Sequence, residues 1–262
     1  MPELPDLEVF RGNIFKKISS KRLFGLEVFS QKIITPQSVL VDELVGCDLL
    51  CIGRIGKELI FDFGDERIIT AHLMLNGGMS IVCNIAEADK IKSKVFSLNF
   101  ENESLVFHDR GHIGTVIKYK PIQSKTPDAL GENFTLDYFL KIAKRKSSAN
   151  IKAFLIDQKV VRGIGNAYVD EILWSARISP KSIVGAVSED VLANLYETIK
   201  AVLHEAIISI KAISPDIISG EERSFLKVHT KLKKETDTGY PIIIEQIASK
   251  KTYFTEEQVV YL

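Results

Sequence analysis

The chain has 262 residues, of which 45% are hydrophobic and 26% are charged. This composition is typical of a well-packed protein of one or two domains. Lysine and arginine together number 34, as do aspartate and glutamate, so the chain lacks the basic excess of many dedicated DNA-binding domains. No apolar run approaches the roughly 20 residues of a membrane span, and the acidic start differs from a secretory signal. We therefore expect a cytoplasmic monomer with no membrane partner.

The first predicted element is a helix, because Leu4, Leu7, Phe10 and Ile14 recur at helical spacing. Short β-rich segments follow, separated by Gly, Asp, Asn and Glu turn residues. They cover residues 59–63, 67–75, 79–82, 95–100, 104–108 and 115–119. Closely spaced strands without intervening helices predict an antiparallel sandwich or barrel.

The pattern changes at residues 121–127, which are punctuated by Pro and Ser. Helical patterns then cover residues 135–146, 149–157, 166–176 and 188–212, and extended runs follow at 240–245 and 251–255. The predicted fold class is α+β: a two-layer β-sandwich with an N-terminal helix, then a helical region and a β-hairpin. We expect domains at residues 1–122, 128–224 and 225–262.

Three cysteines, Cys47, Cys51 and Cys83, form no CxxC pair. Three isolated thiols exclude a disulfide framework and a four-cysteine zinc site. We expect them to be small core residues in a reducing compartment, and we expect no metal and no cofactor.

Basic residues cluster in two segments despite the balanced total. Residues 141–152 contain four lysines and one arginine, residues 227–234 contain four lysines, and neither segment contains an acid. Most charge runs are solvated surfaces, so these segments alone indicate only where a phosphate could bind.

The start of the chain carries a candidate nucleophile. If Met1 is removed, Pro2 becomes a terminal amine, whose pKa of about 7.7 to 8 leaves a sizeable fraction unprotonated at neutral pH. Such an amine can attack an electrophilic sugar carbon, and the adjacent Glu3 carboxyl can move the proton that ring opening requires. The alternative is structural, because Pro2 and Pro5 also suit the first turn of a helix. A retained Met1 would make the Pro2 nitrogen an unreactive amide.

Residues 2–8, PELPDLE, resemble the opening of the formamidopyrimidine-DNA glycosylase and endonuclease VIII family, repair enzymes that excise oxidised bases from DNA. Further matching motifs follow in the family's order across nearly the whole chain. The resemblance implies that Pro2 forms a Schiff base with C1′ of the damaged nucleotide and that Glu3 supplies the acid for opening the sugar. Both are therefore candidate catalytic residues.

Two later segments resemble motifs that contact the lesion. Residues 54–61 resemble the segment whose turn lysine touches the phosphate or damaged base, which makes Lys57 a further candidate catalytic residue. Residues 71–77 resemble the family's HLGMSG strand, and His72 is expected to bind a phosphate beside the lesion. The methionine that fills the gap left by the flipped base is shifted here, so that Leu75 has the void-filling position and Met74 precedes it.

Residues 159–174 resemble the family's helix-two-turn-helix motif. Glycines before a helix let backbone N–H groups approach a phosphate, which the helix N-terminus also attracts. The resemblance assigns this role to Gly165 and to Asn166, whose amide can donate to the same phosphate. Lys152 matches a family lysine on the preceding helix and is expected to face the DNA backbone.

The loop at residues 109–114 departs from the family pattern. There the family inserts an arginine opposite the orphaned base and a phenylalanine as a wedge, because an extruded nucleotide leaves a hole. In this chain Arg110 is out of register and Ile113 replaces the wedge. We assign Arg110 to DNA binding and Ile113 to void filling, without a preference for the opposite base.

The C-terminal tail also departs from the family. Typical members close a four-cysteine zinc finger on a β-hairpin, but the aligned positions hold Glu235, Thr238, Thr255 and Gln258, which cannot form a structural zinc site. Some members have a metal-free hairpin, the zincless finger, and the resemblance implies that form here. Lys250 replaces the finger's phosphate-binding arginine and keeps its charge without the bidentate fork.

The resulting hypothesis is a nucleoid-associated base-excision repair enzyme that binds double-stranded DNA containing oxidised bases or abasic sites. It combines DNA glycosylase and AP lyase activities through one covalent intermediate. Two alternatives stay open. One is a non-catalytic member that binds damaged or distorted DNA, which a retained Met1 and the altered loop favour, and the other is a protein unrelated to DNA whose β-domain binds a small ligand.

Overall fold

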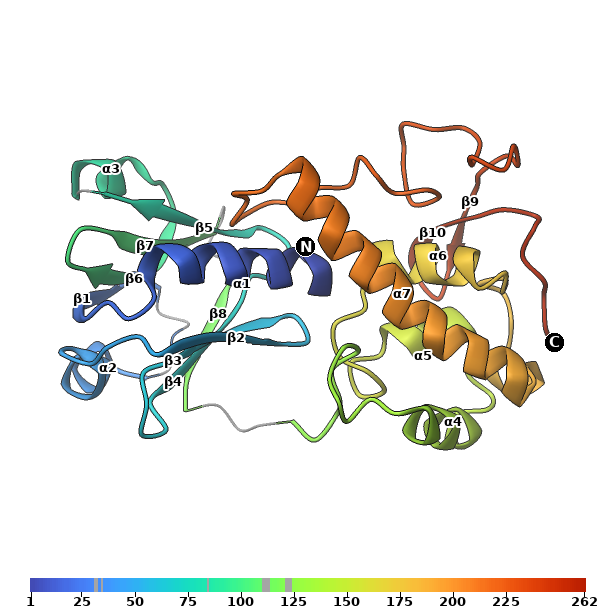
Figure 1. Cartoon of the computed structure of the whole chain (residues 1–262), viewed down its shortest axis with the longest axis horizontal. Helices are drawn as coiled ribbons and strands as arrows, with labels where there is room; N and C mark the ends of the chain where they lie inside the picture. The colour runs from blue at the N-terminus through green and yellow to red at the C-terminus, as the bar shows by residue number, and fades with distance from the viewer. Residues whose placement is uncertain (31–32, 34, 84, 110–113, 121–123) are drawn as a thin grey trace. The chain divides into compact units, whose positions relative to one another are not determined.

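The computed structural model describes residues 1–30, 33, 35–83, 85–109, 114–120 and 124–262, without the side chains of residues 85 and 86. The chain forms two compact units (Figure 1). Unit 1 comprises Met1–Pro2, Asp6–Gln123 and Ile210–Glu221, and unit 2 comprises Glu3–Pro5, Ser124–Ser209 and Glu222–Leu262. Neither unit is therefore one continuous stretch of chain.

Unit 1 is built on two four-stranded sheets (Figure 1). One has the order β1 (Leu23–Val28), β6 (Lys94–Phe100), β7 (Ser104–Asp109) and β5 (Gly77–Val82). The other has the order β2 (Cys51–Ile55), β3 (Glu58–Asp62), β4 (Ile68–His72) and β8 (Val116–Tyr119). Neighbouring strands in both sheets are antiparallel. The predicted two-layer β-sandwich is confirmed.

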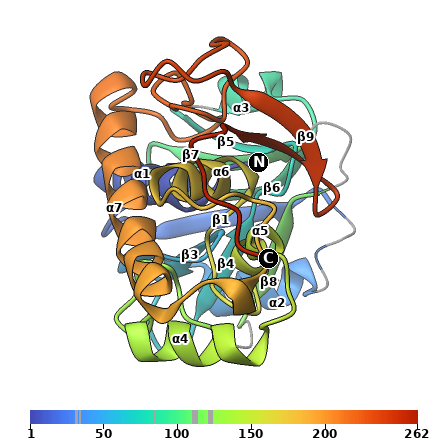
Figure 2. The same cartoon turned by 90° about the vertical axis from the view of Figure 1, so that its right-hand side faces the viewer.

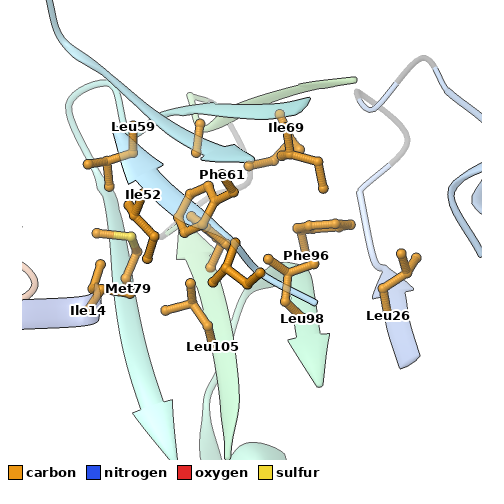
Figure 3. Packing of buried hydrophobic residues seen from close by; sticks show 14 of the residues in the cluster. Ile14, Leu26, Ile52, Leu59, Phe61, Ile69, Met79, Phe96, Leu98 and Leu105 are labelled. Atoms are coloured by element: carbon orange, nitrogen blue, oxygen red, sulfur yellow. The ribbon is translucent and has the colours of Figure 1, made fainter. Parts of the chain in front are cut away.

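The apolar core of unit 1 draws on both sheets (Figure 3). In β3, Leu59 and Phe61 are fully buried while Glu58, Ile60 and Asp62 are half-buried, which is the period of two that a strand imposes. The Phe61 ring packs edge-on against Phe107 of the other sheet, with 5.8 Å between centroids. Such contacts hold the two sheets together through burial of apolar area.

Helix α1 (Leu4–Ile18) adds the predicted apolar stripe, since Leu7, Phe10 and Ile14 belong to the same core. Two short helices, α2 (Gln37–Leu44) and α3 (Ile85–Lys90), also lie in unit 1. The sequence patterns did not indicate these two helices, because six to eight residues are too few for a clear helical period.

The strand predicted at residues 67–75 is shorter than expected. Strand β4 ends at His72, and a turn follows in which the Gly77 amide donates to the Leu73 carbonyl at 2.9 Å. His72 therefore stands at the end of its strand, where a side chain can reach a pocket or a ligand.

The prediction that the cysteines are core residues is wrong. Cys51 and Cys83 are exposed, and Cys47 is half-buried. Cys51 begins β2 on the face opposite to Ile52, which is fully buried. The alternation along the strand places the thiol in solvent.

Unit 2 is mainly helical, as predicted. Its helices are α4 (Leu136–Arg145), α5 (Ile151–Ile156), α6 (Asn166–Ser175), the 3-10 helix η1 (Val184–Ala186) and α7 (Glu189–Ile213), whose last turn from Ile210 belongs to unit 1. Helix α4 begins after Thr135, whose Oγ1 accepts from the Tyr138 amide at 3.2 Å. Helix α5 begins after Asn150, whose Oδ1 accepts from the amides of Lys152 and Ala153. Such caps satisfy amides that have no partner within the helix.

A β-hairpin completes unit 2 (Figure 2). Strand β9 (Ile243–Ile247) pairs with β10 (Lys250–Phe254) in antiparallel register, with Lys250 opposite Ile247. Strand β10 packs against α6, where Trp174 and Tyr253 share a small apolar cluster with Val228. Within the described ranges, no helix is long and apolar enough to cross a membrane.

Candidate functional site

A pocket of about 520 Å³ opens on unit 1. Its walls come from the start of the chain, the turn between β4 and β5, the end of β7 and the loop after α7. We call it the Pro2 pocket, and it is lined by Pro2, Leu75, Asn76, Gly77, Gly78, His108, Ser219, Gly220 and Glu221. Pro2 and Leu75, which the sequence singled out for different roles, therefore share one pocket.

Glu221 lies beside the first residue of the chain. Its carboxylate accepts a hydrogen bond from the Met1 ammonium and forms an ion pair with it. With Met1 in place the Pro2 nitrogen is an amide, and Pro2 itself is buried. A carboxylate in this position can orient an N-terminal amine, which is the group that Pro2 presents once Met1 is removed.

Hydrogen bonds fasten the loop after α7 to the rest of unit 1. Asn13 Nδ2 donates to the Ile217 carbonyl at 2.9 Å, and the Met79 amide donates to Ser219 Oγ at 3.1 Å. Ile217 and Ile218 also pack on the apolar core. One wall of the Pro2 pocket is thereby fixed to α1 and β5.

The end of β4 and the turn that follows it carry the predicted phosphate-binding and void-filling residues. His72 is half-buried, and its Nδ1 accepts from the Met74 amide at 3.0 Å, which leaves the proton of a neutral ring on Nε2. Met74 and Leu75 are 38% and 75% exposed. Two exposed apolar side chains in a turn beside a pocket suit the void-filling role expected of Leu75.

Lys57 follows Gly56 in the turn that joins β2 and β3. The turn agrees with the sequence pattern, but Lys57 is only 9% exposed, which is low for a turn lysine. Lys57 does not line the Pro2 pocket. The expected contact of Lys57 with a phosphate or base therefore stays a prediction.

The altered loop falls mostly outside the described residues, and so do both candidate residues in it, Arg110 and Ile113. The two ends of the loop are joined by Asp109, which is fully buried. Its Oδ2 accepts from the amides of Gly114 and Thr115 at 2.6 and 2.7 Å. The base of the loop is therefore fixed to the end of β7.

In unit 2, the first turn of α6 holds the Glu3 carboxylate. Glu3 is 4% exposed, and its two oxygens accept from the amides of Ala167 at 2.9 Å and Tyr168 at 3.4 Å. A carboxylate at a helix N-terminus is stabilised by the partial positive charge there. Sequence reasoning assigned this helix N-terminus to a DNA phosphate and did not foresee that Glu3 occupies it.

The contact between the Glu3 carboxylate and the first turn of α6 requires a glycine at position 165. A Cβ atom at position 165 would lie 2.3 Å from Glu3 Cδ and 2.5 Å from its Oε1. These distances are far shorter than van der Waals contact. The glycine that was expected to admit a phosphate therefore admits the Glu3 carboxylate in this structure.

Asn166 and Lys250 lie near one another through the hairpin. Asn166 Nδ2 donates to the carbonyl of Lys251 at 2.9 Å, and the amide carries a second N–H that can serve another acceptor. Lys250 begins β10 and is exposed. One hydrogen bond between α6 and β10 thus holds Asn166 next to the residue that follows Lys250.

Lys152 is not on the surface, and the expectation that it faces DNA is wrong for this structure. Its side chain is fully buried, and Nζ lies 2.7 Å from both Asp170 Oδ1 and Thr252 Oγ1. Burial lowers the pKa of Lys152, and the neighbouring Asp170 carboxylate opposes that shift. A match in sequence position does not reveal which groups surround a side chain, and in this structure Asp170 and Thr252 hold Lys152 in the interior.

Asp170 was missed by the sequence analysis. It is buried, and besides Lys152 its carboxylate binds His229 Nδ1 at 2.7 Å and accepts from the Tyr253 amide at 3.0 Å. The signal was present, because Asp170 and Glu171 interrupt an otherwise apolar helix, and buried acids are seldom without partners.

Glu171 joins α6 to a second segment. Its carboxylate accepts from the backbone amides of Lys227, Val228 and His229 at 2.7 to 3.0 Å. Burial raises the pKa of Glu171 against the opposing effect of these amides. We call Glu3, Asp170 and Glu171, with their partners, the α6 network.

The four positions that the resemblance aligns with zinc-binding cysteines do not suit a metal in this chain. Thr255 and Gln258 bind each other, since the Thr255 amide donates to Gln258 Oε1 at 2.9 Å, and Gln258 Nε2 donates to the Ile178 carbonyl at 2.8 Å. Hydroxyl and amide groups are poor zinc ligands. In the part of the chain that the structure describes, no group of three or more His, Cys, Asp or Glu residues could hold a metal ion.

A carboxylate stands at the centre of the hairpin's base instead. Glu257 Oε2 accepts from Thr238 Oγ1 at 2.8 Å, Thr255 Oγ1 at 3.1 Å and Trp174 Nε1 at 3.1 Å. Arg177 forms an ion pair with its other oxygen. Burial raises the pKa of Glu257, but these four donors outweigh that effect and hold the pKa below its ordinary value.

Two family models cover most of the chain. The formamidopyrimidine-DNA glycosylase N-terminal domain matches residues 1–116, and the formamidopyrimidine-DNA glycosylase H2TH domain matches residues 126–216. The boundary between these matches falls in the segment where the sequence pattern changes.

Curated relatives and solved structures agree with the family models. A formamidopyrimidine-DNA glycosylase of Carboxydothermus hydrogenoformans is 35% identical over 205 residues, covering 78% of this chain and 76% of the relative. One from Lactococcus lactis subsp. lactis is 30% identical over 268 residues and covers 97% of both chains. A crystal structure of the Lactococcus lactis protein with THF-DNA and an inhibitor has a TM-score of 0.86 at 27% identity, covering 98% of this chain and 100% of that chain.

A second structure of the Lactococcus lactis protein, in complex with DNA containing an oxidised pyrimidine, has a TM-score of 0.85 at 27% identity and covers 98% of this chain and 99% of that chain. Such agreement in sequence and in fold extends over both units. The chain belongs to the formamidopyrimidine-DNA glycosylase family.

Proposed function

We propose that the protein is a base-excision repair DNA glycosylase with AP lyase activity, which acts on double-stranded DNA containing oxidised bases or abasic sites. The observation that carries the proposal is the Pro2 pocket, which has the candidate nucleophile in its wall. Related Lactococcus lactis structures hold DNA with an oxidised pyrimidine or an abasic site, which supports this class of substrate.

The chemistry starts with removal of Met1. The Pro2 nitrogen attacks C1′ of the damaged nucleotide, and the C1′–base bond breaks as the base leaves with the bonding electrons and takes up a proton. The Glu3 carboxylate takes up the proton that the Pro2 nitrogen loses and delivers it to the ring oxygen as the C1′–O4′ bond breaks, so that an iminium forms between Pro2 and C1′. The iminium is an electron sink, so the C2′ proton can be removed and the 3′ phosphate leaves. One covalent intermediate thus accounts for both activities.

The α6 network supports the part assigned to Glu3. Two backbone amides fix the orientation of its carboxylate, and Glu3 is covalently next to Pro2. Positioned groups accelerate proton transfer by about 10²- to 10⁴-fold. Glu3 therefore acts as the proton donor that the sugar requires.

The DNA contacts are assigned in the same proposal. Lys57, His72, Asn166 and Lys250 bind the phosphate backbone, and Leu75 fills the gap that the extruded nucleotide leaves. Lys152 is a positioning residue instead, because its ammonium holds β10 against α6. The domains proposed from the sequence are residues 1–122, 128–224 and 225–262; they differ from the two compact units, which assign residues 210–221 to unit 1 and the hairpin to unit 2.

Borohydride trapping tests the function. Protein whose loss of Met1 is verified by intact mass is incubated with abasic or oxidised duplex DNA and borohydride, and peptide mapping locates the adduct. We expect a covalent adduct on Pro2, a reduced yield for Pro2→Gly and slow turnover for Glu3→Gln. Binding to lesion DNA without any adduct would contradict the proposed glycosylase and AP lyase activities and identify a non-catalytic DNA-binding protein.

A further inference from the structure

The Pro2 pocket contains one side chain to which neither the sequence motifs nor the proposed mechanism gives a role. His108, near the end of β7, lines the pocket together with Pro2. It is half-buried, so part of the ring is accessible from the pocket side. The position follows from strand geometry, because β7 pairs with β5 and His108 lies opposite Gly78 in the register.

The orientation of the His108 ring is fixed on two sides. Nε2 lies 3.1 Å from Ser80 Oγ, a residue that does not line the pocket. The Cε1 and Nδ1 atoms of the ring lie against Gly78, where a Cβ atom would be 2.5 Å from Cε1 and 3.2 Å from Nδ1. A side chain at position 78 would therefore displace the ring. The glycine lets the imidazole stand directly beside the pocket floor.

The same glycine also admits Ser219, which lies next to the same Cβ position as His108. The added Cβ atom would lie 2.6 Å from Ser219 Oγ, and Ser219 is held by the Met79 amide at 3.1 Å. An aromatic ring with polar nitrogens and a hydroxyl therefore lie on the same side of Gly78 in the lining of the pocket. Enzymes that extrude a base read it through hydrogen bonds to its edge and through stacking on flat side chains, and these two residues offer both.

We propose that His108 is a specificity-determining residue that contacts the extruded base in the Pro2 pocket and so selects which oxidised bases are excised. The proposal rests on the proposed function. It assigns His108 to the base and not to the sugar, because the sugar chemistry already has Pro2 and Glu3. An abasic site has no base, so His108 contributes to base excision and not to cleavage at a preformed abasic site.

The test compares two kinds of substrate in single-turnover experiments. Wild type, His108→Ala, His108→Gln and the control His204→Ala, which alters an exposed histidine on α7, are assayed on duplexes with a formamidopyrimidine, an oxidised pyrimidine or a preformed abasic site. For His108→Ala we expect excision of the preferred base to fall about tenfold or more, as when a hydrogen-bonding or stacking contact is lost. Cleavage of the abasic duplex should stay within about twofold of wild type, since its chemistry is unchanged.

The pattern across variants decides the outcome. His108→Gln retains hydrogen-bonding groups and should recover part of the excision rate or change the order of preference among lesions, while His204→Ala should match wild type. Equal losses on base-containing and abasic duplexes would mean a structural role and overturn the proposal, as would unchanged rates on every lesion. If wild type itself cleaves no abasic duplex and excises no base, the proposed function fails instead, and the assignment of His108 falls with it.

Discussion

The Pro2 pocket and the α6 network use polar side chains in opposite ways. The pocket is open and lined by glycines and short side chains, with a histidine and a carboxylate at its edge. In the α6 network, three buried carboxylates on or against one helix each accept two or more hydrogen bonds. The pocket keeps room for a substrate, whereas the network fixes the backbone and, through Glu3, the orientation of the proposed proton donor.

The difference has an energetic basis. A buried carboxylate costs several kcal/mol unless it is paired and hydrogen-bonded, so the α6 network stays intact only as a complete set. It joins the start of the chain, the segment 227–229 and strand β10 to the same helix. Changes in the network should therefore lower stability, while changes in the pocket should alter activity at nearly constant stability.

The largest effect should follow from breaking the network at Asp170. In Asp170→Ala the Lys152 ammonium stays buried without its carboxylate, and the free energy of unfolding should fall by about 3–5 kcal/mol. Urea denaturation measures the loss. The control is Asp237→Ala, which removes an exposed ion pair with Lys233 and should cost less than about 1 kcal/mol. Similar losses for the two variants would show that burial in the α6 network does not increase the contribution of a carboxylate to the free energy of unfolding.

Gly165→Ala tests whether the α6 network positions Glu3 for the proposed proton transfer. The added methyl group displaces the Glu3 carboxylate from the first turn of α6, and a misplacement of about 1 Å can cost about 100-fold in rate. Single-turnover cleavage of an abasic duplex measures this. Gly12→Ala in α1 serves as the control, because a Cβ atom there meets nothing within 4 Å. A rate for Gly165→Ala equal to that of the control would remove Glu3 from the proposed mechanism.

The same contrast explains what could be predicted from the sequence. The sandwich, the helical region and the hairpin follow from local periods and turn residues, which act over a few neighbouring positions. The environment of Lys152 could not be predicted from such local patterns, because its partners lie 18 and 100 residues away along the chain. The Pro2 pocket is similar: Pro2 and Leu75 came from motifs, but His108 and Glu221 enter it through strand register and a loop position that no local pattern encodes.

A smaller effect is expected at the base of the hairpin, where Glu257 accepts hydrogen bonds from Thr238 and Thr255. Glu257→Ala removes four hydrogen-bonding contacts and should destabilise the hairpin by about 1–3 kcal/mol. Hydrogen exchange of the β9 and β10 amides measures local opening, and Glu256→Ala at the exposed neighbouring position is the control. Chelator or added zinc should leave the exchange of wild type unchanged, and a response to either would contradict a metal-free hairpin.

The hairpin should also respond to acid. The pKa of Glu257 is lowered in the folded protein from its ordinary value of 4.5, so its contribution to stability is fully present above that value. The contribution is lost as the pH falls below 4.5 through the lowered folded-state pKa. Thermal unfolding of wild type and Glu257→Ala between pH 7 and pH 3 should therefore converge toward the acid end. Parallel curves over the whole range would show that the carboxylate charge has no part in holding the hairpin.

The smallest effect should come from Lys250, which is exposed at the start of β10 and belongs to neither the pocket nor the buried network. Lys250→Ala removes one phosphate contact, so affinity should fall evenly for all lesions and the slope of log K against log salt should decrease by about 1. Fluorescence anisotropy across salt concentrations measures the slope, with Lys17→Ala, exposed on α1, as the control. An unchanged slope would exclude Lys250 from the DNA interface. A change that differed between lesions would instead mean that the hairpin helps to read the base, and the division between a pocket that selects and a network that positions would no longer hold.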